Sequence, residues 1–145
     1  MTESPADESA PEQEARTEIA PPPGRAAGER SRLALAAFIT FAGVAHFVIP
    51  GFYERIIPRA LGHERALVRW SGVAEILCGA LIAVPRTKRI GAWATLILLI
   101  AVYPANLQMA LDAGRPHDAE SWGAWIRLPF QVPMWVWAYR NATRD

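Results

Sequence analysis

Five polar side chains that could bind a ligand or move a proton interrupt stretches of the sequence that are otherwise apolar. They are His46, Glu75, Asn106, Arg127 and Gln131. A histidine and a carboxylate can exchange protons, an arginine can donate hydrogen bonds to an oxygen, and an amide can both donate and accept. Charged residues inside membrane spans are rare, usually face the protein interior and often mark function. We therefore interpret the five as a candidate intramembrane binding site, without assigning catalytic residues.

Four apolar stretches contain these residues, and each has the length of a membrane span. They cover residues 33–49, 68–84, 90–111 and 122–139. A spanning helix needs about 20 apolar residues, within a range of about 17 to 25. The sequence thus predicts an all-α fold, an integral membrane four-helix bundle with up-down-up-down topology over residues 31–140, whose main partner is the lipid bilayer.

The first 30 residues differ sharply from the rest in composition. They hold seven acidic and three basic residues and the triplet Pro21-Pro22-Pro23. Such a segment cannot bury enough apolar surface to offset its ordering entropy, so we predict a disordered tail. Eight Lys and Arg residues lie at the span ends on the side of the N-terminus, and five lie on the other side. This asymmetry predicts a multi-pass protein of the cytoplasmic membrane with both termini in the cytoplasm.

Several classes of function do not fit this composition. The basic residues lie between apolar stretches. A nucleic-acid-binding protein would instead show a basic stripe on a polar domain, so we expect no nucleic-acid partner. Cys78 is the single cysteine, which excludes a disulfide or a dithiol within the chain. Three scattered histidines and one cysteine lack the spacing of metal ligands, so we expect no metal site.

The alternating topology brings the five polar residues to one depth. At about 1.5 Å per residue, they lie about 5 to 14 Å from the outer ends of their spans. Ser71, Gly72 and Gly79 share a helical stripe with Glu75, and small residues there let another helix approach. We therefore expect a shared polar site in the outer half of the bilayer.

Each of these residues also has a structural interpretation. Glu75 and Arg127 could form an ion pair that locks the second span to the fourth, because desolvating either charge alone is expensive. His46 could be a satisfied interior histidine. Asn106 and Gln131 could be hydrogen-bonding amides that hold spans together.

The order of these segments resembles the DoxX-like family of small four-span membrane proteins. The resemblance covers residues 33–140 and rests on five short stretches in order. These are Ala42–Phe47 with Pro50, Ser71-Gly72 with Glu75 and Gly79, Pro85-Arg86 with Arg89, Tyr103–Asn106 with Met109-Ala110, and Arg127–Pro129 with Gln131. The resemblance implies a four-helix bundle in the cytoplasmic membrane that is often redox-associated, with a redox partner protein or a place as a membrane subunit of an oxidoreductase.

Two hypotheses about function follow from these observations. In the first, the polar layer of a redox-associated membrane protein binds a quinone headgroup or a similar small molecule, with His46 or Arg127 donating to an oxygen and Glu75 relaying protons. In the second, the protein is a non-catalytic membrane scaffold or assembly factor, and its polar layer only fixes helix packing. A transporter fits less well, because four spans without inverted repeats leave little room for alternating access. The sequence does not determine the oligomeric state.

Overall fold

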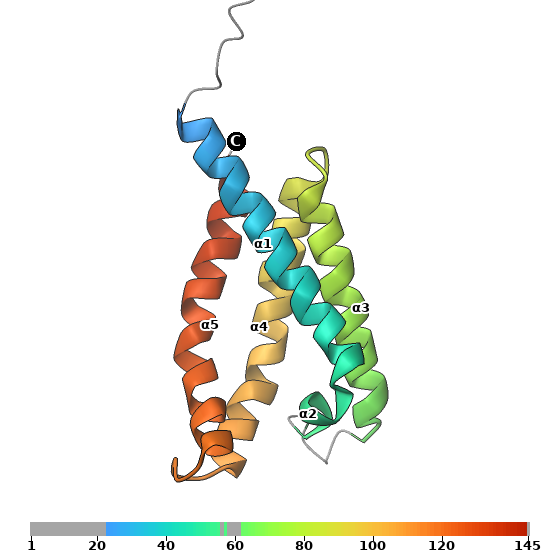
Figure 1. The fold of residues 1–145 in the computed structure, drawn as a ribbon, viewed down its shortest axis with the longest axis vertical. Coiled ribbons are helices and arrows are strands. Elements are labelled where there is room, and N and C mark those ends of the chain that lie inside the picture. Colours follow the sequence, from blue (N-terminus) through green and yellow to red (C-terminus); the bar gives the residue numbers. More distant parts are fainter. Residues whose placement is uncertain (1–22, 56, 58–61, 145) are drawn as a thin grey trace, which may run out of the picture.

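The chain folds into helices joined by short connections. The computed structural model describes residues 23–55, 57 and 62–144, and every regular element in these ranges is an α-helix, which confirms the all-α prediction. The elements are α1 (Pro23–Val48), α2 (Pro50–Glu54), α3 (Glu64–Ala83), α4 (Lys88–Asp112) and α5 (Ala119–Thr143). The four long helices alternate in direction, and the start of α1 and the end of α5 lie at the same end of the molecule (Figure 1).

Two parts of the chain are more helical than the sequence predicted. α1 begins at Pro23, so residues 23–30 are helical and do not belong to a disordered tail. Proline is favoured at the first helical position, and the Ala and Arg residues that follow are good helix formers. Residues 1–22 of the predicted tail lie outside the described residues. The predicted loop 50–67 contains α2, which also starts at a proline, Pro50.

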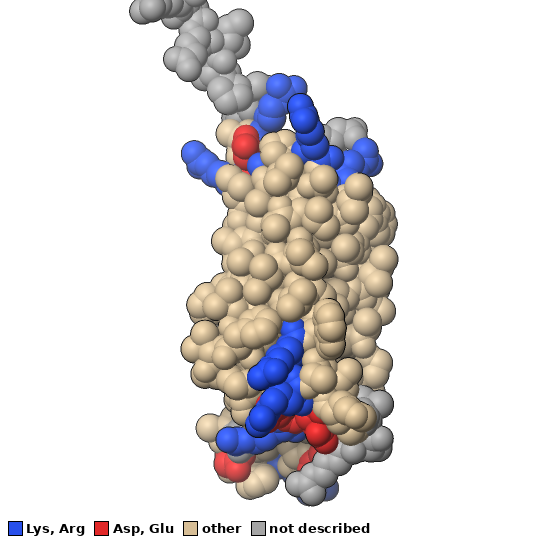
Figure 2. Space-filling model, turned by 90° about the vertical axis from the view of Figure 1, so that its right-hand side faces the viewer, with Lys and Arg blue, Asp and Glu red and all other residues tan. Residues whose placement is uncertain are grey.

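Three helices, α1, α3 and α4, are long and apolar enough to cross a membrane. Large apolar side chains face outward on all of them; for example, Phe41 is 73% exposed and Trp70 is 71% exposed. Figure 2 shows a broad band without charged residues between charged groups at the two ends of the molecule. An apolar surface of this extent is unusual for a soluble monomer. These features fit a multi-pass membrane protein.

Glycines set the close packing of α1 against α3. A Cβ atom on Gly72 would lie 2.9 Å from the Gly43 carbonyl oxygen, and one on Gly43 would lie 2.7 Å from the Gly72 carbonyl oxygen. One on Gly79 would lie 2.9 Å from the carbonyl oxygen of Ala36. Backbone therefore meets backbone along this interface, as is common where membrane helices associate through small residues. This stripe is the one that the sequence predicted around Glu75.

The apolar core lies toward the end that holds the described termini. It combines Leu35, Ala36 and Ile39 of α1 and Cys78 and Ile82 of α3 with Ala92 of α4 and Met134, Ala138 and Ala142 of α5. Most of these side chains are small, so packing depends on close helix approach. Within the described part, α1 packs chiefly on α3 and α4 chiefly on α5, whereas α1 and α5 touch little.

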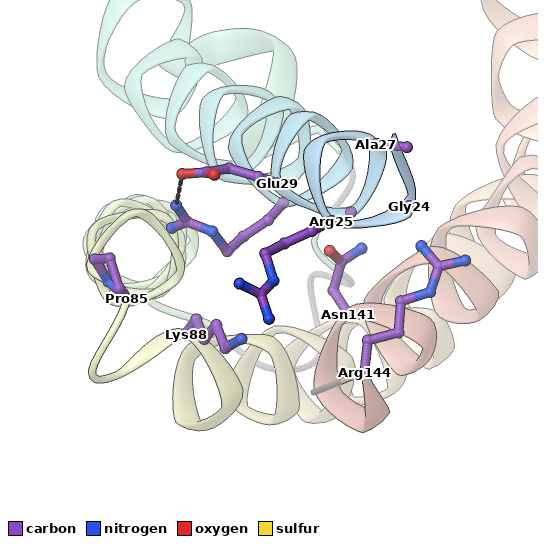
Figure 3. Close-up of a pocket in the computed structure, with 10 residues that line it drawn as sticks. Gly24, Arg25, Ala27, Glu29, Pro85, Lys88, Asn141 and Arg144 are labelled. Atoms are coloured by element: carbon purple, nitrogen blue, oxygen red, sulfur yellow. Dashed lines mark hydrogen bonds and ion pairs between the residues drawn. The ribbon is translucent and has the colours of Figure 1, made fainter. Parts of the chain in front are cut away.

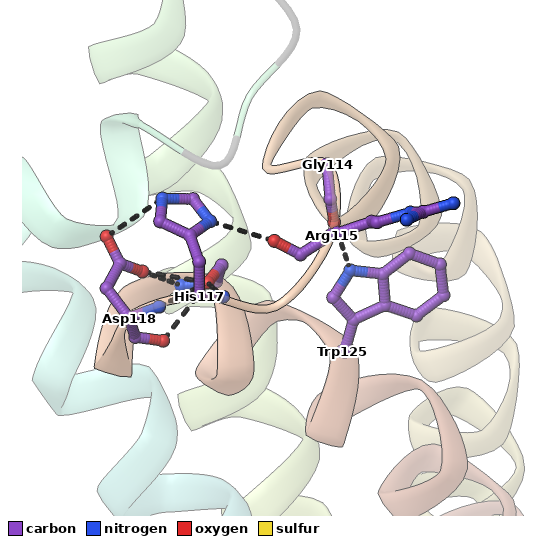
Figure 4. A network of polar contacts seen from close by, with 6 residues as sticks. Gly114, Arg115, His117, Asp118 and Trp125 are labelled. Atoms are coloured by element: carbon purple, nitrogen blue, oxygen red, sulfur yellow. Dashed lines mark hydrogen bonds and ion pairs between the residues drawn. The ribbon is translucent and has the colours of Figure 1, made fainter.

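The start of α5 is fixed by a network of hydrogen bonds at the α4–α5 connection (Figure 4). The Asp118 carboxylate accepts from the Ser121 backbone N–H at 2.8 Å, and the Ser121 hydroxyl accepts from the Asp118 N–H at 3.1 Å. This reciprocal pair is a capping box. The Trp125 indole N–H also donates to the Gly114 carbonyl at 2.7 Å. α5 consequently begins three residues before the predicted fourth span.

The glycine interface predicts that a single methyl group will destabilise the protein. We expect Gly79→Ala to lower the free energy of unfolding by about 1 to 3 kcal/mol, because overpacking forces the backbones apart. Gly123→Ala is the matched control, since a Cβ on this α5 glycine would meet no atom within 4 Å. At this position, alanine should leave the free energy of unfolding unchanged or raise it by up to about 1 kcal/mol, because alanine favours the helix more than glycine does. Denaturant unfolding in detergent measures both, and equal effects would contradict the role of Gly79.

Candidate functional site

His46 on α1 and Glu75 on α3 come together in the interface that the glycines create. The Nδ1 atom of His46 lies 3.3 Å from Oε2 of Glu75 and 2.8 Å from the Ala42 carbonyl oxygen. Because the carbonyl can only accept, Nδ1 carries a proton that it donates to Ala42. Oε2 of Glu75 is fully buried and has no hydrogen-bond partner. The two side chains are therefore within ion-pair distance, but the carboxylate keeps an unused acceptor.

The short helix α2 adds Tyr53 to this pair. Its ring stacks on the His46 imidazole, with centroids 3.8 Å apart and planes 23° from parallel. Phe52 contacts the Tyr53 ring edge-on at 5.4 Å. Burial raises the pKa of the Tyr53 phenol above its usual range, and the negative charge of Glu75 raises that pKa further. Tyr53 consequently remains a neutral hydroxyl donor near neutral pH.

Tyr53 was not among the residues that the sequence singled out. Phe52 and Tyr53 lie between the first two predicted spans, residues 33–49 and 68–84. The signal that could have identified it is Pro50-Gly51, because proline at the first position of a helix predicts a new helical turn there. That turn folds the chain back and places Tyr53 against His46, seven residues earlier.

Arg127 on α5 approaches the same region from the opposite side. Its guanidinium carbon lies 4.6 Å from the centre of the Phe52 ring, and its Nη1 lies 3.8 Å from the Met109 sulfur. A cation over an aromatic face is attracted by the ring's electrons. Within the described part of the chain, however, Arg127 has no carboxylate partner. The structural ion pair between Glu75 and Arg127 is therefore not formed, because Glu75 turns to His46 on α1.

Asn106 and Gln131 form a separate contact between α4 and α5. The Asn106 amide donates to the Gln131 side-chain oxygen at 3.1 Å, and the Gln131 amide donates to the Leu99 carbonyl. Gln131 is buried, with 5% of its surface exposed. Pro104 lies within α4 and removes one backbone donor from the helix. Gln131 donates to the Leu99 carbonyl, one residue before the Ile100 carbonyl that loses its helical donor at Pro104.

The structure thus divides the predicted polar layer into two groups. The first, which we call the outer polar cluster, consists of His46, Tyr53, Glu75 and Arg127, linked through ring contacts with Phe52. The second is the amide pair of Asn106 and Gln131, whose hydrogen bonds are satisfied. Arg127 lies one helical turn before Gln131 on α5. Within the described residues, no group of three or more His, Cys, Asp or Glu could hold a metal ion.

The amide pair predicts coupled losses of stability. We expect Gln131→Met and Asn106→Leu each to lower the free energy of unfolding by about 0.6 to 2 kcal/mol, as measured for interhelical hydrogen bonds in membranes. The double variant should lose less than the sum, because the two side chains share a bond. Gln108→Met is the control, since this exposed amide bonds only to Asp112 on its own helix. Additive losses in detergent unfolding would exclude the pairing.

Comparison with known proteins gives a family but no activity. No curated protein and no solved structure matches this chain. No DoxX-like family matches either, so the DoxX-like assignment is wrong, and the redox association that it implied has no support from these comparisons. The stretches that carried the resemblance contain small and polar residues. Such residues are common wherever membrane helices pack closely, so they do not identify one family. A family described as a domain of unknown function (DUF8561) matches residues 35–142. Because this match covers most of the chain, the protein belongs to the DUF8561 family.

Proposed function

We propose that the protein crosses the membrane four times, with both termini in the cytoplasm. α5 has 25 residues, as does α4, and at about 1.5 Å per residue such a helix is about 37 Å long, enough to span a bilayer. Its polar interruptions face inward, since Gln131 is buried and Arg127 is half-buried. The end that carries both described termini holds more of the Lys and Arg residues, which supports the cytoplasmic side.

We further propose that the outer polar cluster binds a small lipid-soluble molecule with carbonyl oxygens, such as a quinone headgroup. The observation that carries this proposal is that Glu75 and Arg127, both half-buried, on α3 and α5, do not pair with each other. Among the described residues, the direct contacts of the Arg127 guanidinium are an aromatic ring and a sulfur atom, and Oε2 of Glu75 accepts no hydrogen bond. Hydrogen-bonding groups left unused within a membrane are costly. A quinone carbonyl would accept from Arg127, and a hydroxyl of the reduced headgroup would donate to Oε2 of Glu75.

The chemistry of the cluster suits a planar ligand of this kind. Arg127 offers guanidinium N–H donors to a carbonyl oxygen, and Tyr53 offers a neutral hydroxyl. The rings of Phe52, Tyr53 and His46 provide flat apolar surfaces beside these donors. His46 and Glu75 lie close enough to pass a proton between them. The proposal concerns binding; it assigns no catalytic step.

Quinone binding to the purified full-length protein tests this role. We expect Arg127→Met to weaken binding of a short-chain quinone about 10- to 100-fold, the loss that corresponds to a hydrogen bond from a charged donor. Glu75→Gln and Tyr53→Phe should also weaken it, while the melting temperature changes little. Arg69→Met is the matched control, because Arg69 is an exposed arginine on α3. Equal quinone affinity in wild type and Arg127→Met would refute the proposed site.

A second candidate is a non-catalytic scaffold or assembly factor, and the amide pair favours it. Asn106, Gln131 and the Leu99 carbonyl satisfy one another, as expected of polar groups that serve packing alone. If the whole polar layer had this purpose, Glu75→Gln and Arg127→Met would lower thermal stability together and show coupling in a double-mutant cycle. The same variants with an intact melting temperature and lost quinone binding would instead support the ligand site.

A further inference from the structure

A cavity of about 680 Å³ opens at the end of the molecule that holds the described termini. It lies between the start of α1, the α3–α4 connection and the end of α5. Figure 3 shows that its charged side chains come from the start of α1, the start of α4 and the residue that follows α5. Four of the lining residues are basic, namely Arg25, Arg32, Lys88 and Arg144, and one, Glu29, is acidic. We call this cavity the basic pocket.

Two of these five charges already have partners within the protein. Arg32 is buried and donates from Nη1 to the carbonyl oxygens of Ile82 and Ala83, both at 2.6 Å. It thereby caps the C-terminal end of α3, where a cation is favoured by the helix dipole. Its Nη2 lies 3.4 Å from the Glu29 carboxylate. Arg32 therefore has a structural role, and Glu29 is held by Arg32.

Three cations around the pocket have no counter-charge among the described residues. Arg25, Lys88 and Arg144 have no side-chain ion pair within the described part of the chain. Like charges placed around one cavity repel each other unless an anion lies between them. The arrangement therefore calls for an anionic group, and basic pockets at the cytoplasmic end of membrane helices suit the phosphate of a lipid headgroup.

A second cavity adjoins the basic pocket and indicates which kind of anion fits there. A groove of about 470 Å³ runs between α1 and α5, the helix pair that touches little, and Arg144 belongs to both cavities. Its wall combines the apolar residues Val132, Pro133, Val136 and Trp137 with Ser31 of α1 and the cations Arg140 and Arg144. The Trp137 indole donates to the Ser31 hydroxyl at 3.0 Å and bridges the two helices there. A soluble anion would not need this apolar extension, whereas an acyl chain would fill it.

We propose that the basic pocket and the adjoining groove form a binding site for one anionic phospholipid. The phosphate lies among Arg25, Lys88 and Arg144, and one acyl chain lies in the α1–α5 groove beside Val136. This site is at the opposite end of the molecule from the outer polar cluster, so it is independent of the proposed quinone binding, and it rests on the proposed topology with both termini in the cytoplasm.

Native mass spectrometry of the full-length protein with added lipid tests the site. We expect phosphatidylglycerol to bind more tightly than phosphatidylcholine with identical acyl chains. Each of Arg25→Gln, Lys88→Gln and Arg144→Gln should weaken phosphatidylglycerol binding about fivefold, and the triple variant on the order of a hundredfold, given the usual contribution of a basic residue near an anionic lipid. Arg115→Gln, an exposed arginine at the other end, should leave binding unchanged.

The groove and the nature of the anion are tested separately. Val136→Trp should obstruct the groove and weaken phosphatidylglycerol binding, whereas Val44→Trp, at an exposed valine elsewhere on α1, should not. Inorganic phosphate at millimolar concentration should fail to displace the lipid. Circular dichroism verifies that every variant keeps its helix content. The proposal fails if both lipids bind equally, if Arg115→Gln weakens binding as much as Lys88→Gln, or if inorganic phosphate displaces the lipid completely.

Discussion

The close approach of α1 and α3 is the constraint on which the rest of this structure depends. At Gly43, Gly72 and Gly79 the two backbones lie closer than any side chain would allow. In a membrane, where lipid tails are as apolar as leucine, such packing and interhelical hydrogen bonds replace the hydrophobic effect as the force between helices. The same approach sets His46 beside Glu75, so one interface provides both stability and the polar cluster.

The polar groups at the two ends of the molecule differ in how far their hydrogen-bonding atoms find partners within the protein. At the end with the described termini, Arg32 donates to the last carbonyls of α3, and the small-residue core lies just below it. At the other end, Glu75 retains an unused acceptor and Arg127 has no carboxylate partner. The buried arginine at the first end is therefore satisfied within the protein, whereas the half-buried groups at the other end keep unused hydrogen-bonding atoms. This difference is the reason that we place the ligand of the proposed function at the outer end.

α5 shows how a helix with weak apolar character is kept in place. It contains Arg127, Gln131 and two prolines, yet it is continuous from Ala119 to Thr143. Gln131 bonds both to Asn106 and to the backbone of α4, and Arg127 lies over an aromatic ring. On the α1 side the same helix makes few contacts and leaves a groove. α5 is thus held by α4, and its free side is the one that a lipid can reach.

The sequence by itself determined the helical class, the three most apolar helices and the polar stripe around Glu75, because these depend on composition and on spacing along one helix. It could not determine which partner each polar residue takes. Glu75 was expected either to pair with Arg127 or to share a site with His46 and the other polar residues; it lies 3.3 Å from His46 and does not pair with Arg127. Tyr53 enters the cluster through a helix predicted as loop, and Arg32 serves as a cap on α3. Partner choice depends on how each helix is rotated and crossed against its neighbours, and contacts between residues far apart in the chain fix those angles.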